Sequence, residues 1–220
     1  MSTIAIVGGH GKVALELAQV LAAQGHGVRS LIRNQHQGAD VERTGAVPYW
    51  LDLETADAGD LAEAFADADA AVFSAGAGPD GNIDRKRTVD LEGSLKSIEG
   101  ARQAGVTRFV QVSAMGVDEP LPEDTDPIWR AYVEAKRDAD TALRDSGLDW
   151  TIVRPGHLTD GVTTALVTVG DRLPRGDIAR ADVASVLAHV LADESTVGLQ
   201  FEVVGGETPI PEALASLGRG

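Results

Sequence analysis

Two side chains that can transfer protons, those of Tyr132 and Lys136, stand four residues apart in the sequence. If the surrounding segment is helical, the phenol and the ammonium group lie on one face, a single turn apart. A neighbouring ammonium group favours the phenolate form, which brings the tyrosine pKa closer to the range that acid–base catalysis uses. Ser113 ends an expected strand upstream, where it could polarise a carbonyl group and orient the phenol. We predict that Ser113, Tyr132 and Lys136 form a catalytic set; a tyrosine packed beside a solvated lysine is the alternative.

A glycine-rich turn lies near the N-terminus, between an expected strand at residues 3–7 and an expected helix at residues 12–24. Gly8 suits the tight turn, and Gly11 lets the backbone approach a pyrophosphate at the positive end of the helix. The spacing differs from the common G-x-G-x-x-G pattern, and a plain turn that uses glycine for positive φ is the alternative. The position after a strand and before a helix favours a dinucleotide site formed by Gly8, Gly9, His10, Gly11, Lys12 and Val13.

Arg33 ends the expected second strand, where NAD-preferring proteins usually place an acidic residue that binds the ribose 2′-hydroxyl group. A guanidinium group at this position pairs instead with a 2′-phosphate, through its bidentate fork. Lys12 could approach the same phosphate. The sequence therefore favours NADP, with NAD as the alternative cofactor and a solvated arginine as the non-functional alternative.

Further predicted cofactor contacts come from residues at the ends of other strands. Asp52 is a candidate for the adenine edge, and the small residues after the fourth expected strand leave room for the adenosine ribose. Lys136 could hydrogen-bond the nicotinamide ribose, and the segment after residue 154 is expected beside the nicotinamide, where His157 could contact substrate. These positions add Asp52, Leu53, Ser74, Ala75, Gly76, Val112, Lys136, Pro155, Gly156 and His157 to the predicted cofactor-binding set.

Expected strands and helices alternate along most of the chain. Strands are predicted over residues 3–7, 28–33, 47–51, 70–75, 107–113, 149–154 and 200–204. Helices are predicted over residues 12–24, 61–66, 84–104, 128–146, 181–192 and 211–217. Strands separated by helices form βαβ units, so we predict a Rossmann-type α/β fold, a doubly wound parallel sheet with helices on both faces.

Two stretches interrupt this alternation. Residues 116–127 are acidic and proline-rich, and residues 159–180 combine a short strand with loop. Both follow the carboxyl ends of strands, the edge at which open α/β sheets bind ligands. We predict that they form the walls of a substrate pocket, within a single domain over residues 1–220 that has a short C-terminal substrate region.

The composition excludes several classes of function. The formal net charge is −15. This argues against nucleic-acid binding, which needs a basic face on the protein. The chain contains no cysteine, which rules out disulfides, cysteine-ligated zinc and thiol catalysis. The histidines and the acidic residues of 116–127 show no metal-ligand spacing, so no metal site is predicted. Without a long apolar run or a signal peptide, we expect a cytoplasmic monomer or homodimer, away from membranes, that acts on a small molecule.

Six stretches carry a family resemblance: residues 4–11, 104–110, 112–116, 132–136, 149–156 and 205–210. Together they span essentially the whole chain. The chain resembles the atypical short-chain dehydrogenases/reductases, in the small NAD(P)H-binding group that includes NmrA-like and biliverdin- or flavin-reductase-like proteins. The resemblance implies a Rossmann fold, an NAD(P) site and a Ser113, Tyr132 and Lys136 set like the family's Ser-Tyr-Lys arrangement.

The sequence departs from the family pattern in two places. The family's catalytic tetrad includes an asparagine on the long helix, whereas this helix carries Asp90, Ser94 and Lys96. A proton relay through that position therefore lacks its usual residue. The C-terminal substrate lobe is also abbreviated, which indicates a small or shallow substrate site.

Three functions are consistent with these features. The leading interpretation is an NAD(P)H-dependent oxidoreductase that transfers hydride to a small carbonyl, quinone or flavin-like acceptor, and Tyr132 and Lys136 favour it. The missing asparagine favours the second, a non-catalytic NADP-sensing regulatory protein, which the NmrA-like resemblance permits. The third is a sugar-nucleotide epimerase or dehydratase, which the short C-terminal region disfavours.

Overall fold

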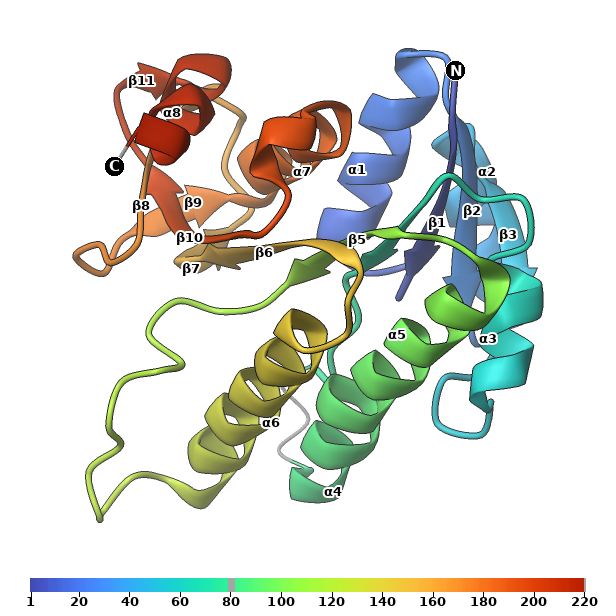
Figure 1. The fold of residues 1–220 in the computed structure, drawn as a ribbon, viewed down its shortest axis with the longest axis horizontal. Helices are drawn as coiled ribbons and strands as arrows, with labels where there is room; N and C mark the ends of the chain where they lie inside the picture. Colours follow the sequence, from blue (N-terminus) through green and yellow to red (C-terminus); the bar gives the residue numbers. More distant parts are fainter. Residues whose placement is uncertain (79–81, 220) are drawn as a thin grey trace.

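A computed structural model describes residues 1–78 and 82–219 of the chain. Its described residues form a central sheet of nine strands in the order β11-β8-β10-β6-β5-β4-β1-β2-β3 (Figure 1). Seven strands run parallel to one another. The other two, β8 and β11, lie at one edge of the sheet, where β8 is antiparallel to β10 and β11 is antiparallel to β8. The parallel strands are β1 (Thr3–Val7), β2 (Gly27–Ile32), β3 (Val47–Trp50), β4 (Ala70–Phe73), β5 (Arg108–Val112), β6 (Asp149–Pro155) and β10 (Leu199–Gly205).

Helices cover both faces of this sheet (Figure 1). One face carries α1 (Lys12–Ala23), α2 (Gly38–Arg43), α7 (Arg180–Ala192) and α8 (Ile210–Ser216), and the other carries α3 (Ala58–Ala64), α5 (Glu92–Ala104) and α6 (Pro127–Arg144). Ile4 and Ile6 of β1 belong to the core on the first face, whereas Ala5 and Val7 belong to the core on the second. Alternate side chains of a strand point to opposite faces, so a strand buried on both sides reads as a continuous apolar run. The predicted doubly wound Rossmann-type fold is confirmed.

The predicted helix at residues 84–104 is confirmed, but it is not regular. It starts as α4 (Ile83–Arg85), continues as the π-helical segment η2 (Lys86–Leu91) and ends as α5. A π-helical turn closes with i→i+5 hydrogen bonds and holds an extra residue, and such turns occur frequently at functional sites. Apolar periodicity in the sequence does not show this change, because the segment contains few apolar residues.

The stretch at residues 159–180 contains more strand than predicted. β7 (His157–Thr159) pairs with β9 (Asp177–Ala179) in a separate two-stranded sheet, and β8 (Leu166–Gly170) joins the main sheet beside β10 and β11 (Thr208–Pro209). The prediction also lacked α2 and three short 3₁₀ segments: η1 (Gln35–Gln37), η3 (Glu194–Thr196) and η4 (Leu217–Arg219). Strands this short are specified mainly by the neighbour with which they pair, which periodicity does not reveal.

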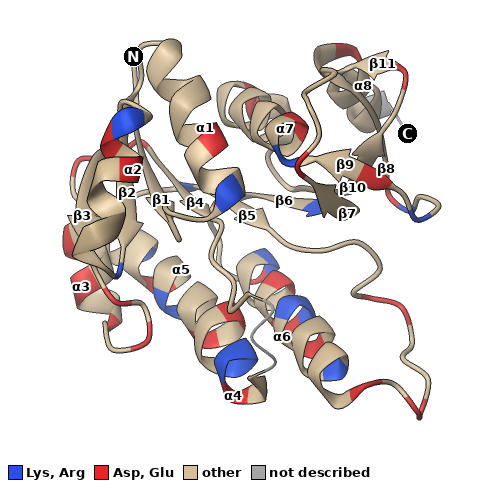
Figure 2. Ribbon diagram, turned by 180° about the vertical axis from the view of Figure 1, so that it is seen from behind, with Lys and Arg blue, Asp and Glu red and all other residues tan. Residues whose placement is uncertain are grey.

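The two predicted pocket walls are tied together by a buried carboxylate. Glu202 on β10 accepts hydrogen bonds at 2.8 Å from the backbone N–H of Gly116 and, also at 2.8 Å, from that of Leu173. Arg172 and Glu119 form an ion pair across the same gap, with nitrogen and oxygen 2.8 Å apart. Acidic residues lie along the connection from β5 to α6 (Figure 2). The walls are therefore held against β10 and against each other.

Candidate functional site

The glycine-rich turn connects β1 to α1 and contacts two neighbouring strands. Gly8 has a φ of +79°, and a Cβ atom on it would stand 2.6 Å from the Cα atom of Ala75. The Gly11 N–H donates to the Gly8 carbonyl oxygen at 2.9 Å, and the Gly9 N–H donates to that of Leu31 at 2.9 Å. The turn is thus packed so closely against the segment after β4 that only glycine fits at residue 8.

Helix α1 begins directly after this turn with its N-terminus open. Gly11 is the N-cap residue and provides no side-chain hydrogen bond, and the first helical turn contains no acidic residue. The first N–H groups of a helix lack partners within the helix and carry the positive end of its dipole. Together with the adjoining cavity described below, this arrangement suits the phosphates of a dinucleotide.

Substituting alanine for Gly8 should lower the free energy of unfolding by about 2–3 kcal/mol, because a left-handed backbone and an overpacked contact both cost energy. Gly147→Ala is the matched control, since Gly147 has a φ of +77° but nothing lies within 4 Å of its added Cβ. Urea unfolding of both variants separates the two contributions. Equal losses of stability would show that the contact with Ala75 has no energetic weight.

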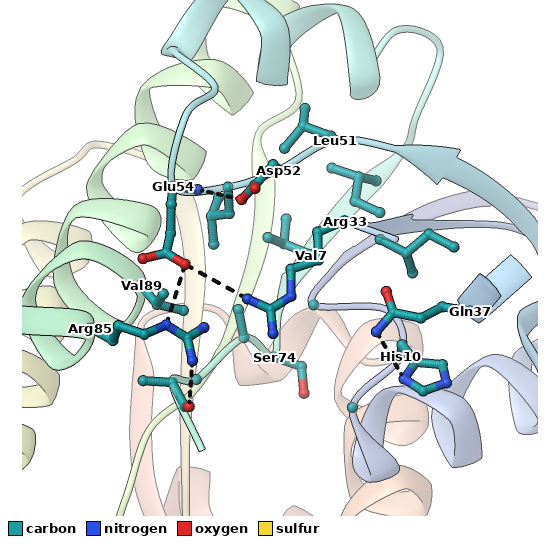
Figure 3. A pocket seen from close by; sticks show the side chains of 18 residues that line it. Val7, His10, Arg33, Gln37, Leu51, Asp52, Glu54, Ser74, Arg85 and Val89 are labelled. Carbon is teal, nitrogen blue, oxygen red and sulfur yellow. Dashed lines mark hydrogen bonds and ion pairs between the residues drawn. The ribbon is translucent and has the colours of Figure 1, made fainter. Parts of the chain in front are cut away.

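A cavity of about 250 Å³ opens beside the turn, at the carboxyl ends of β1, β2 and β4 (Figure 3). Nine residues of the predicted cofactor set line it: Gly8, His10, Gly11, Arg33, Asp52, Leu53, Ser74, Ala75 and Gly76. Further lining residues were not predicted, among them Gln37, Glu54, Arg85 and Val89. The structure thus brings the predicted phosphate, ribose and adenine contacts together around one cavity.

Arg33 lies in this cavity, opposite an acidic side chain. Its Nη1 is 3.7 Å from Oε2 of Glu54, and Nε of Arg85 is 3.3 Å from the same oxygen (Figure 3). The hydroxyl group of Thr88 donates to the other Glu54 oxygen at 2.9 Å. The guanidinium groups of Arg33 and Arg85 therefore converge on the Glu54 carboxylate. Arg33 is also the residue predicted to pair with the 2′-phosphate of NADP.

His10 and Lys12 point to different partners. Nε2 of His10 is 2.7 Å from Asp40, and Nδ1 is 3.2 Å from the Gln37 amide nitrogen, so the ring is held against η1 and α2. Lys12 donates to Asp160 at 2.6 Å, far along the sequence, and is not paired with the Arg33 side of the cavity. The Lys12 hydrogen bond lowers the pKa of Asp160, and the charge of Arg180 contributes in the same direction. The structure thus places Lys12 toward the segment after β7 rather than beside Arg33.

Ser113 follows β5 and hydrogen-bonds a fully buried carboxylate. Its hydroxyl group donates to Oδ2 of Asp140 on α6 at 2.7 Å. Arg154 on β6 donates to the same oxygen from Nε at 3.0 Å and from Nη2 at 2.7 Å. The Gln111 amide donates to Oδ1 at 2.7 Å. Asp140 therefore accepts four hydrogen bonds, which compensate for the burial of its charge.

Tyr132 and Lys136 lie on the same face of α6, as predicted. The Tyr132 ring contacts Trp129 at a centroid distance of 5.3 Å, and Nζ of Lys86 lies 5.6 Å from its centroid. Lys136 is buried, with Nζ 3.4 Å from Oδ1 of Asp90, 3.4 Å from the Ala75 carbonyl oxygen and 3.3 Å from that of Val112. The Lys136 ammonium group thus contacts both Ala75 and Val112, the residue that precedes Ser113 at the end of β5.

The other predicted residues have structural contacts. Val13 is buried in the core, and Pro155 accepts the backbone N–H of Met115 at 3.1 Å. A Cβ atom on Gly156 would stand 2.2 Å from the Gly176 carbonyl oxygen, so this glycine allows the chain before β9 to pack closely. His157 is exposed, with Nδ1 3.1 Å from Asp177. Gly9, Lys12, Val13, Val112, Lys136, Pro155, Gly156 and His157 lie outside the residues that line the cavity.

Two features are absent from residues 1–78 and 82–219. This part of the chain contains no group of three or more His, Asp or Glu side chains arranged to hold a metal ion. Its helices include none that is both long and apolar enough to cross a membrane.

Residues 8–194 match the family model described as NAD(P)H-binding. The chain belongs to this NAD(P)H-binding family. It is 35% identical over 213 residues to a Bacillus subtilis protein named "Uncharacterized sugar epimerase YhfK", covering 96% of this chain and 98% of the relative. A solved Bacillus halodurans structure named "Putative NAD-dependent epimerase/dehydratase" has a TM-score of 0.90 and 37% identity, covering 99% of this chain and 100% of the other. Sanguinarine reductase from Eschscholzia californica is 33% identical over 137 residues, covering 57% of this chain and 48% of that enzyme.

The residues of the cavity fit the NAD(P)H ligand of this family. The open N-terminus of α1 and the turn at Gly8 suit the pyrophosphate, because backbone N–H groups there have no side-chain cap. Arg33 offers a cation in the cavity wall, and Asp52 offers an acceptor after β3. Small residues after β4 complete the wall: Ser74, Ala75, Gly76 and Ala77.

Four residues that line the cavity or contact a predicted catalytic residue were not assigned from the sequence: Glu54, Arg85, Asp90 and Asp140. Asp140 lies one helical turn beyond Lys136 on the same face as Tyr132, so the spacing in the sequence is a signal for it. In the sequence, Asp90 is recognisable only as one of the residues on the helix where the family has its asparagine. Glu54 and Arg85 gave no signal, because neither forms a motif with its neighbours in sequence.

Proposed function

We propose that this protein is an NAD(P)H-dependent oxidoreductase that reduces a small carbonyl, quinone or flavin-like acceptor. One observation carries the proposal: Nζ of Lys136 contacts both the carbonyl oxygen of Ala75, which lines the cavity, and that of Val112, next to Ser113. Lys136, one of the predicted acid–base residues, therefore adjoins the cofactor cavity. Bound NAD(P)H supplies the hydride. Tyr132 supplies the proton that the reduced oxygen atom of a carbonyl or quinone requires.

The hydrogen bonds of Ser113 refine its role. A serine hydroxyl group has one proton and two lone pairs, and here the proton is donated to Asp140. Toward the substrate, Ser113 therefore offers an acceptor rather than the donor that would polarise a carbonyl group. It is suited to orient the Tyr132 phenol or the hydroxyl group of a reduced product, and the role of carbonyl donor falls to Tyr132.

The relatives support reduction, with one competing indication. The name of sanguinarine reductase indicates a reductase among the relatives of this chain. The names of the Bacillus subtilis and Bacillus halodurans relatives indicate epimerase chemistry instead. An epimerase returns the hydride to its substrate, so it would interconvert sugar nucleotides without net consumption of NADPH. Incubation with carbonyl, quinone, flavin and sugar-nucleotide panels distinguishes the two; tight cofactor binding without turnover in any panel would favour a regulatory sensor.

Replacing Arg33 with alanine should weaken NADPH binding about 10- to 100-fold and leave NADH binding nearly unchanged, because only NADPH has the 2′-phosphate that a guanidinium group pairs with. Fluorescence titration of the reduced cofactors measures both dissociation constants. Glu54→Gln is the informative companion, because it removes the carboxylate with which Arg33 is paired. It should tighten NADPH binding. Equal affinities for NADPH and NADH in the unmodified protein would refute the preference for NADP.

A further inference from the structure

Asp90 is a buried carboxylate that the proposed reaction does not use directly. It lies in the π-helical segment η2 and is 1% exposed. Its Oδ2 accepts the backbone N–H of Ala77, a cavity-lining residue, at 3.0 Å. Its Oδ1 accepts no hydrogen bond in the described part of the chain, and the Lys136 ammonium nitrogen lies 3.4 Å away. A buried carboxylate with so few donors is stabilised by a nearby cation.

Lys136 is equally dependent on Asp90. An ammonium group has three protons, and its three close oxygen atoms are two neutral carbonyl groups and one carboxylate. The carboxylate is thus the negative charge that contacts it. Burial alone would lower the pKa of Lys136, but the charges of Asp90, Tyr132 and Asp140 outweigh burial and raise it. Lys136 and Asp90 therefore form a buried pair with no net charge.

This pairing changes what Lys136 does to Tyr132. Four charged groups surround the phenol: Lys136 and Asp140 from α6, and Asp90 and Lys86 from η2. Burial raises the pKa of Tyr132, Lys136 lowers it, and the charges of Asp90 and Asp140 raise it again. The net direction is upward. The ammonium group alone, as the sequence presents it, predicts a lowered Tyr132 pKa, and this prediction is wrong.

We propose that Asp90 is a positioning residue that neutralises Lys136 and thereby keeps Tyr132 a protonated phenol, so that the site donates a proton rather than accepts one. The inference rests on the proposed reductase function and specifies its direction. As hydride reaches the carbon atom of the acceptor, the phenol O–H bond breaks and its proton passes to the acceptor oxygen. The resulting phenolate regains a proton from water.

The test uses the small number of tyrosines, since the chain contains only Tyr49 and Tyr132. In a Tyr49→Phe background, the absorbance of the phenolate as a function of pH reports Tyr132 alone, without cofactor or substrate. Asp90→Asn should lower the pKa of Tyr132 by about one unit or more, because the freed ammonium charge then stabilises the phenolate. Glu92→Gln is the matched control: Glu92 lies on the same long helix but pairs with Arg87 at the surface, so the Tyr132 pKa should not move.

An unchanged or higher Tyr132 pKa in folded Asp90→Asn protein would overturn the inference. If that variant does not fold, the double variant Asp90→Asn, Lys136→Met removes both charges of the pair. A neutral pair predicts that the phenol then titrates within about half a unit of its original position, whereas an increase of about a unit or more would show that Lys136 had acted on it unopposed. Absence of NADPH oxidation with every acceptor would refute the reductase function and would leave this titration unaffected.

Discussion

Replacing Tyr132 with phenylalanine should slow NADPH-dependent reduction of a carbonyl or quinone acceptor about 10²- to 10⁴-fold, the range over which positioned proton donors contribute to catalysis. The substitution removes only the phenolic hydroxyl group and keeps the ring that packs on Trp129. Binding of NADPH should be unchanged, because Tyr132 does not line the cofactor cavity. The loss should therefore appear in kcat and in kcat/KM together. Steady-state oxidation of NADPH measures both.

Tyr49→Phe is the matched control, because it removes the only other phenol of the chain from β3. Its turnover should equal that of the unmodified protein. Unchanged turnover in Tyr132→Phe with a ketone acceptor would show that another group donates the proton. A flavin acceptor provides an internal comparison, since reduction at its ring nitrogen needs no protein acid and should survive the substitution.

Replacing Arg154 with methionine should destabilise the fold by about 3–5 kcal/mol, the usual cost of leaving a buried charge without its partner. Arg154 is 4% exposed and donates to the fully buried Asp140 through two nitrogen atoms. Methionine replaces most of the volume but none of the charge. Asp140 would keep hydrogen bonds from Ser113 and Gln111 and lose those from the Arg154 guanidinium group. Urea unfolding followed by circular dichroism measures the loss.

Two further variants make this prediction specific. Arg172→Met removes an ion pair with Glu119 in which the arginine side chain is 78% exposed, and surface pairs of this kind contribute about 0–1 kcal/mol. Combining Arg154→Met with Asp140→Leu should recover most of the lost stability, because an apolar pair of similar volume leaves no unpaired charge. If Arg154→Met alone is as stable as the Arg172→Met control, the buried contact between Arg154 and Asp140 does not stabilise the fold.

The overall fold could be predicted from the sequence because its signals are local. The apolar run at residues 3–7, the helical spacing that follows and the glycines between them are properties of neighbouring residues. Their structure depends on backbone sterics and on burial of one face or two, which are the same wherever the segment lies. The position of the cavity is also predictable, since the carboxyl ends of parallel strands share one edge. Gly8, Arg33, Asp52 and Ser74 are all found there.

The charge state of the site depended on the tertiary structure. Tyr132 and Lys136 were recognised from their spacing, but the effect of one on the other is set by Asp90, which lies on a different helix and in a π-helical turn. The Ser113 hydroxyl group likewise donates its proton to Asp140, which lies 27 residues away in the sequence. Local patterns determine helices, strands and turns, because those interactions span a few residues. The partner of a charged group is determined by packing, and the strength of the pairing by burial, so the chemistry of this site was decided only when the chain folded.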